Sequence, residues 1–326
     1  MSKLPKVVYF GADAICLPGL QYLHLSAGDI CELAGVISQP DRPQGRGKRL
    51  QANPVSAYAL AQGIPLLQPS KPDAELVDWL QSHDVSVAFV MAYGHFLPRA
   101  VREAPTFGMW NFHGSLLPKY RGASPAESAI AEGESETGVC LMRVVKAMDG
   151  GAVADYESVS IGPSMTSPEL RVSISEAVVP LLERNLKAAC LGELITKEQD
   201  TAQATYCRKL FKQDGAIDFE LSAQAIYDRM RAFTPWPGAY FEHEEVRIKV
   251  GSAKVLRSAC TSEPGTVLSA NQELLVATDE GVIGFAELQR PGGKLLPTSD
   301  FLRGYPICQG EMLSGGKSVP LVRKEP

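Results

Sequence analysis

The feature that most constrains the fold is the alternation of short apolar runs with helical stretches before Asp200. Runs such as VVYF, VSVAFVMA and GVCLMRVV are too continuous for strands that have one solvated face. They are typical of strands buried on both faces, as in a largely parallel sheet built from βαβ units. We expect strands over 6–11, 33–38, 65–67, 85–92, 108–112 and 138–145, with helices near 18–27, 54–62, 73–82 and 166–191.

The pattern changes after Asp200. One helix is expected over 222–233, followed by a Pro-rich corner at 234–238 and several short alternating runs closed by turn residues. Short strands at this spacing indicate a small antiparallel barrel. The sequence therefore predicts an α/β domain over 1–191, a linker over 192–208 and a barrel domain over 209–326.

Composition narrows the class of protein. The chain has 326 residues, of which 45% are hydrophobic, and contains no apolar run near the ~20 residues of a membrane helix. The N-terminus lacks the order of a signal peptide, so we expect a cytoplasmic protein. The seven cysteines form no C-x-x-C pair and have no histidine at metal spacing, so we expect small reduced hydrophobes and no metal site.

The formal net charge of −5 excludes the strongly basic balance of a general nucleic-acid binder. Residues 208–326 carry 15 Lys and Arg against 15 Asp and Glu, so the negative charge belongs to residues 1–207. Any contact with nucleic acid must therefore be local.

The segment NFHGSLLPKYRGASP (111–125) begins at the end of a predicted strand, where ligands bind in open α/β sheets. Asn111 and His113 are two residues apart on an extended segment, so their side chains point to the same side. An amide donor and an imidazole aimed at one point can stabilise an oxyanion. The turn through Leu117 and Pro118 offers apolar walls for a planar ring. The alternative is a histidine satisfied within the core.

Asp149 follows the predicted strand 138–145 and precedes two glycines, which let backbone approach a ligand closely. We expect its loop to leave the same sheet edge as the Asn111 segment, so that its carboxylate can orient His113 and accept a proton. The alternative is an ordinary turn aspartate.

Together, these residues resemble the folate-dependent formyltransferases. SQPDRPQGRGKRL (38–50), AYG (92–94), ATYCRKL (204–210) and RAFTPWPGAY (231–240) are similar to the family that acts on methionyl-tRNA, across nearly the whole chain. The resemblance implies a Rossmann-like formyltransferase domain and an OB-like barrel that helps to hold tRNA. It implies formyl transfer from 10-formyltetrahydrofolate, as co-substrate, to the α-amine of initiator methionyl-tRNA, with no metal.

The resemblance also assigns residues. It implies that Asn111, His113 and Asp149 are catalytic. It implies a folate site made of Ser115, Leu116, Leu117 and Pro118 together with Ala92, Tyr93 and Gly94. The chain departs from the family pattern at Gly11-Ala12-Asp13, Ser124 and Ala152. None of these is a proposed catalytic position, so the implied reaction type is unaffected.

The segment PDRPQGRGKRL is the most basic window of the N-terminal part and has no Walker spacing. Its prolines and glycines predict an irregular loop. We interpret it as a contact for the tRNA acceptor stem, since arginine binds phosphates and base edges. The alternative is a solvated surface loop. The basic residues concerned are Arg42, Arg46, Lys48 and Arg49.

Three other functions stay open at this point. A formyltransferase acting on a nucleotide sugar or another small amine would share the catalytic core without needing the basic loop and barrel. A hydrolase would release formate from the same folate. A tRNA-binding protein with a vestigial α/β domain is the non-catalytic alternative. We expect a monomer and no membrane partner.

Overall fold

The computed structural model describes residues 3–44, 49–256 and 260–325. Contacts divide the chain into two compact units. The first comprises Met1–Gly122, Glu136–Ser160 and Arg171–Tyr206, and the second Ala123–Ser135, Ile161–Leu170 and Cys207–Pro326. Each unit is assembled from separate stretches of chain. The predicted boundaries at 191 and 209 are boundaries between pieces of chain that should fold alone. That division of the chain stays a prediction.

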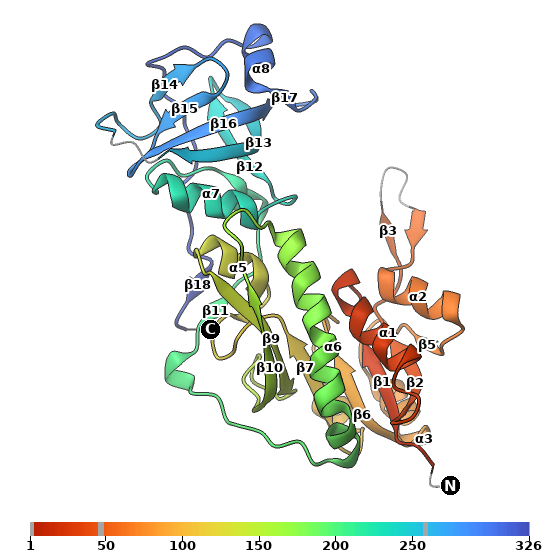
Figure 1. Cartoon of the computed structure of the whole chain (residues 1–326). Helices are drawn as coiled ribbons and strands as arrows, with labels where there is room; N and C mark the ends of the chain where they lie inside the picture. Colours follow the sequence, from red (N-terminus) through yellow and green to blue (C-terminus); the bar gives the residue numbers. More distant parts are fainter. Residues whose placement is uncertain (1–2, 45–48, 257–259, 326) are drawn as a thin grey trace. The chain divides into compact units, whose positions relative to one another are not determined.

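The first unit is built on a seven-stranded sheet of order β10-β9-β7-β6-β1-β2-β5 (Figure 1). The five strands β7, β6, β1, β2 and β5 pair in parallel. β9 is antiparallel to β7, and β10 is antiparallel to β9. The predicted mainly parallel sheet is therefore confirmed. β10 was not predicted, because it has no apolar run and Val159 is its one buried residue. The strands are β1 (Lys6–Phe10), β2 (Glu32–Ile37), β5 (Leu66–Leu67), β6 (Val85–Val90), β7 (Met109–His113), β9 (Glu136–Arg143) and β10 (Val153–Ser160).

Helices cover both faces of this sheet, which explains the continuous apolar runs. On one face, Leu76 and Leu80 of α3 join Val8 and Phe10 of β1 in a buried cluster. On the other, Gly19 of α1 lies against α6, which runs in front of the sheet in Figure 1. The helices are α1 (Leu17–Leu25), α2 (Pro54–Gln62), α3 (Ala74–Ser82), α4 (Arg99–Glu103) and α6 (Ser167–Leu191).

The second unit contains an antiparallel sheet of order β12-β13-β16-β15-β14, with β17 paired to β16. Its core includes Phe241 and Phe285, whose rings stack with centroids 5.7 Å apart. Residues near 312–314 bridge to Glu242 and Thr266, so one segment joins both ends of the sheet. The expected OB-like domain is confirmed as this curled half-barrel. Its strands are β12 (Ala239–His243), β13 (Val246–Leu256), β14 (Val267–Ala270), β15 (Leu274–Ala277), β16 (Val282–Gln289) and β17 (Leu296–Pro297).

The second unit also contains α5 (Pro125–Ala131), α7 (Ala223–Ala232) and α8 (Thr298–Gly304). The described ranges include shorter elements as well. They are the single turns η1 (Ala14–Cys16), η2 (Thr201–Gln203) and η3 (Lys212–Gly215) and the strands β3 (Arg42–Gln44), β4 (Arg49–Gln51), β8 (Arg121–Gly122), β11 (Tyr206–Cys207) and β18 (Val322–Arg323).

The basic segment is more regular than its glycines and prolines suggested. β3 and β4 pair antiparallel, with Arg42 opposite Gln51 and Pro43 opposite Leu50. The expectation of an irregular loop is therefore wrong for these two arms. A two-stranded ribbon has outer edges, where a proline that cannot donate a hydrogen bond is tolerated. Arg46 and Lys48 lie outside the described residues.

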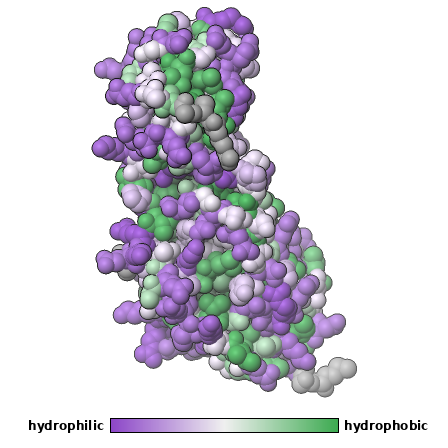
Figure 2. Space-filling view, turned by 60° about the vertical axis from the view of Figure 1, so that its left-hand side comes forward, coloured by the Kyte–Doolittle hydropathy of each residue, from purple (hydrophilic) through white to green (hydrophobic). Residues whose placement is uncertain are grey.

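None of the helices in the described ranges is long and apolar enough to cross a membrane. Large exposed hydrophobic side chains are spread along the chain, for example Leu25 of α1, Leu60 of α2 and Ile195 in the segment after α6. On the face in Figure 2, green residues gather in small separate patches among purple ones. Cys16, Cys31, Cys140, Cys190 and Cys207 are buried, as expected of small hydrophobes, whereas Cys308 is exposed.

Candidate active site

The end of β7 places an amide and an imidazole on the same side of the sheet, as the spacing predicted. Asn111 lies opposite Val90 of β6 and Met142 of β9. Its side chain is half-buried and makes no hydrogen bond with the described residues. His113 is only 6% exposed. The Asn111 carboxamide therefore remains available to bind a ligand.

The His113 ring is oriented by a backbone carbonyl. Its Nε2 lies 2.8 Å from the carbonyl oxygen of Tyr120. Because a carbonyl can only accept, Nε2 carries a proton. Nδ1 faces Asp149, 3.7 Å from its Oδ2. Nδ1 is therefore the ring atom that can gain or lose a proton without breaking the contact with Tyr120.

The Asp149 carboxylate is held by a backbone amide. Gly122 donates its N–H to Asp149 Oδ2 at 2.8 Å. The backbone of Asp149 has φ 46°, a left-handed conformation that costs a residue with a Cβ of order 1 kcal/mol or more. The following glycines, Gly150 and Gly151, accommodate the tight path of the chain.

Asp149 reaches His113 by a different route from the one expected. β9 runs antiparallel to β7, with Arg143 opposite Trp110 and Cys140 opposite His113. The end of β9 therefore lies at the edge where β7 begins, and the expectation of a shared edge is wrong. Residues 144–152 make an excursion that carries Asp149 back towards His113, and the chain rejoins Arg143, which donates its N–H to Ala152. The direction of β9 determines the edge at which its following loop leaves the sheet, and an apolar run in the sequence does not indicate the direction of its strand.

The turn after His113 has a buried polar side and a half-exposed apolar side. Ser115 is fully buried and donates its hydroxyl to the Lys119 carbonyl at 2.7 Å. Leu117 donates its N–H to Cys140 Sγ at 3.3 Å. Burial raises the pKa of the Cys140 thiol to about 12, so it stays protonated. Leu116, Leu117 and Pro118 remain half-buried, and they provide the apolar surface on which a ring can pack.

The segment 92–94 presents backbone to solvent. Ala92 and Gly94 have φ values of 45° and 77° and are exposed. The Tyr93 ring is buried edge-on against Phe10, with centroids 5.3 Å apart, and burial raises its pKa to about 12. The Tyr93 carbonyl accepts a hydrogen bond from Gln39 at 2.6 Å. The side chain of Tyr93 belongs to the core, which leaves the main chain of 92–94 to meet a ligand.

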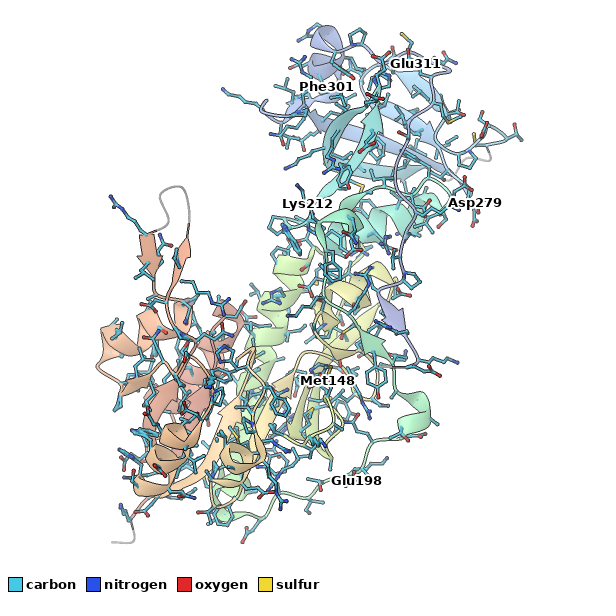
Figure 3. All side chains as sticks on the ribbon, turned by 180° about the vertical axis from the view of Figure 1, so that it is seen from behind. Met148, Glu198, Lys212, Asp279, Phe301 and Glu311 are labelled. Carbon is cyan, nitrogen blue, oxygen red and sulfur yellow. The ribbon has the colours of Figure 1, made fainter. Side chains whose placement is uncertain are left out.

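The site is also surrounded by three residues that the sequence analysis did not single out. They are Tyr120, Arg121 and Gln199. Gln199 donates to the carbonyls of Asp149 and Gly151 at 2.8 and 2.7 Å. Figure 3 labels Met148 and Glu198, the chain neighbours of Asp149 and Gln199. Gln199 lies in the segment predicted as a linker, where nothing in its spacing indicates a partner 50 residues earlier.

The other predicted positions within the described residues are Arg42 and Arg49, on β3 and β4. Arg42 donates to the Gln39 side chain at 2.7 Å, and Arg49 is exposed on β4. Across residues 3–44, 49–256 and 260–325, no group of three or more His, Cys, Asp or Glu side chains could hold a metal ion. The chemistry available here is that of an amide, an imidazole and a carboxylate.

The chain is similar to known proteins over most of its length. The formyl transferase family model matches residues 6–185, and the model of the formyl transferase C-terminal domain matches residues 209–306. A methionyl-tRNA formyltransferase of Sorangium cellulosum is 39% identical, covering 94% of this chain and 99% of the relative. One from Moorella thermoacetica is 36% identical, with the same coverage.

Solved structures share the fold at lower identity. An N-formyltransferase from Helicobacter canadensis, solved with folinic acid and dTDP-3-aminofucose, has a TM-score of 0.65 at 16% identity. The comparison covers 88% of this chain and 99% of that one. WlaRD, a sugar 3N-formyl transferase, has a TM-score of 0.61 at 15% identity, covering 89% of this chain and 98% of that one.

Proposed function

The chain belongs to the formyl transferase family, among the methionyl-tRNA formyltransferases, and from this membership we propose which of its residues carry the reaction. The enzyme transfers a formyl group from 10-formyltetrahydrofolate to the α-amine of initiator methionyl-tRNA, for translation initiation. The observation that carries the residue assignment is the placement of Asn111 and His113 two residues apart on β7, with the Asp149 carboxylate 3.7 Å from the His113 ring.

In this proposal, the α-amine attacks the formyl carbon on N10 of the folate. The Asn111 carboxamide donates to the resulting oxyanion, and His113 donates from Nδ1 as imidazolium. Asp149 stabilises that imidazolium from 3.7 Å and accepts the proton that the amine loses, directly or through water. The oxyanion then reforms the carbonyl, the bond from the formyl carbon to N10 breaks, and N10 takes up the proton held by Asp149, directly or through water, as tetrahydrofolate leaves.

We assign folate binding to the turn and to the segment 92–94. The pteridine ring packs on Leu116, Leu117 and Pro118, and its polar edge meets the exposed main chain of 92–94. Ser115 acts by holding the turn through the Lys119 carbonyl. Tyr93 contributes main-chain groups only, since its ring is buried.

We assign tRNA contact to the hairpin formed by β3 and β4, called the basic hairpin below, and to the second unit with its curled half-barrel. Arg42 and Arg49 lie on β3 and β4, and Arg46 and Lys48 lie between them in the sequence. Phosphate contacts of this kind position a nucleic acid without reading its sequence. We also propose that the enzyme acts in the cytoplasm as a monomer, a state that sedimentation of the purified protein tests directly.

The decisive experiment incubates the protein with 10-formyltetrahydrofolate and charged initiator tRNA and measures formylmethionine. Formylation of methionyl-tRNA supports the proposal. Formate released without an acceptor would indicate a hydrolase, and transfer only to an amino sugar nucleotide would indicate the small-amine alternative. The sugar formyltransferases share the fold at 15–16% identity, which does not transfer their substrate to this chain.

A further inference from the structure

Gln199 connects a buried arginine to the loop that carries Asp149. Its Oε1 accepts hydrogen bonds from Arg121 Nε at 3.1 Å and Nη2 at 2.8 Å. Its Nε2 donates to the carbonyls of Asp149 at 2.8 Å and Gly151 at 2.7 Å. The four hydrogen bonds of this amide therefore connect Arg121 to Asp149 and Gly151, the two residues that flank Gly150.

The orientation of the Gln199 amide is determined by its partners. Arginine can only donate and carbonyl oxygens can only accept, so the oxygen must face Arg121 and the nitrogen must face the loop. Arg121 is 4% exposed, and its Nη1 donates to the Tyr206 hydroxyl at 3.2 Å. A charged donor strengthens such bonds and polarises the amide, which makes its N–H groups better donors.

The loop needs hydrogen bonds that hold its backbone, because Asp149 has a left-handed conformation with φ 46°. A non-glycine residue in that conformation persists when its surroundings hold it there. The Gly122 amide holds the carboxylate, whereas Gln199 holds the backbone on both sides of Gly150. The two sets of bonds fix different atoms of the same loop.

We propose that Gln199, braced by Arg121, is a positioning residue that holds the Asp149 carboxylate in place against His113. This proposal rests on the proposed function, in which Asp149 accepts a proton. It gives the segment predicted as a linker a role in catalysis, since Gln199 lies eight residues beyond the end of α6 at Leu191.

The test compares two substitutions of the full-length protein. Gln199→Glu keeps the acceptors for Arg121 and turns both donors into acceptors that repel the carbonyls. Gln199→Met is neutral and removes donors and acceptors at similar length. Each should lower kcat ~10- to 100-fold, the order of effect expected when a catalytic group is displaced by about 1 Å. Equilibrium binding of a folate analogue should be unchanged. Gln81→Glu, on an exposed face of α3, controls for the added charge and should keep full activity.

A double-mutant cycle with Asp149→Asn separates positioning from a merely structural role. If Gln199 acts through Asp149, Gln199→Glu should cost little further activity once the carboxylate is gone. A full additional loss of kcat in the double variant would overturn the proposal, as would a normal kcat for both Gln199 variants. Failure of both to fold, judged by circular dichroism, would assign Gln199 a structural role and also overturn it.

The same cycle distinguishes this proposal from the function on which it rests. If Asp149→Asn is slow and the Gln199 variants are normal, only the positioning role fails. If Asp149→Asn keeps the full rate, the proton-accepting role of Asp149 fails, and the positioning role fails with it.

Discussion

His113 and Asp149 face each other at 3.7 Å, yet the shortest contact of each side chain is with a backbone group. The ring is held by the Tyr120 carbonyl and the carboxylate by the Gly122 amide, each at 2.8 Å. Neither side chain depends on the other for its position. Each can therefore change protonation state during the reaction while its geometry is preserved.

The first prediction concerns the proposed oxyanion donors. Asn111→Ala and His113→Ala should each lower kcat by ~10² or more, because both groups act on charge that develops in the transition state. Steady-state kinetics with charged tRNA measure the effect. His83→Ala, a histidine that stacks on Trp79 outside the site, should leave kcat unchanged. A near-normal kcat for either site variant would remove that residue from the mechanism.

The second prediction concerns the carboxylate. Asp149→Asn keeps an oxygen that can accept the Gly122 N–H, so the loop should retain its path. An amide cannot take up the proton of the attacking amine, so kcat should fall by ~10² or more. Folate binding, measured by equilibrium titration with an analogue, should stay normal. A variant with the full rate would mean that another group accepts the proton.

The third prediction concerns the basic hairpin. Replacing Arg46 and Lys48 with Ala should raise KM for charged tRNA and flatten its dependence on salt, since fewer phosphates would be neutralised. Folate affinity should hardly change. Arg99→Ala, which removes an exposed charge on α4, is the matched control. An unaltered salt dependence in the double variant would favour the solvated-loop alternative.

The fourth prediction concerns pH and stability in the second unit. Burial alone would raise the pKa of Asp214, but hydrogen bonds from Arg208 and from the Phe211 amide outweigh it and leave the pKa lowered. The stabilisation is therefore present above the ordinary pKa of 3.8 and is lost as pH falls through the lower folded value. Breaking a buried pair typically costs about 3 kcal/mol or more.

Urea unfolding should accordingly find Asp214→Asn less stable than the native chain above pH 4, with the gap closing as pH falls further. Asp300→Asn breaks an exposed pair with Arg303 and serves as the control, with a change within about 1 kcal/mol. A gap that stays constant down to low pH would mean that the ionised form of Asp214 is not the source of the stability.

The sequence predicted best where the signals are local. The helix expected at 54–62 is α2, which is opened by the Asn53 side chain accepting the Ser56 N–H and closed by Gly63 at φ 66°. The side shared by Asn111 and His113 follows from the period of a strand. Each of these features depends on residues only a few positions apart.

Features that depend on tertiary pairing were missed. The direction of β9 decides the edge from which the Asp149 loop leaves, and the apolar run is the same for either direction. Gln199 and Arg121 meet across 78 residues of chain, and neither type of residue indicates a role on its own. The direct partner of the His113 ring is a main-chain carbonyl, and that choice is independent of the identity of residue 120.

The discontinuous make-up of the second unit has a consequence for the protein as it is synthesised. Ala129 and Ile130 of α5 are fully buried in the finished unit, where α5 packs with α7. The carbonyls of Gly162 and Met165 likewise accept hydrogen bonds from Arg231 of α7. The ribosome makes α7 roughly 90 residues after α5, a delay of roughly 5 to 20 s at typical elongation rates. Throughout that interval α5 lacks its partner helix, so the nascent chain presents an apolar surface that chaperones can bind.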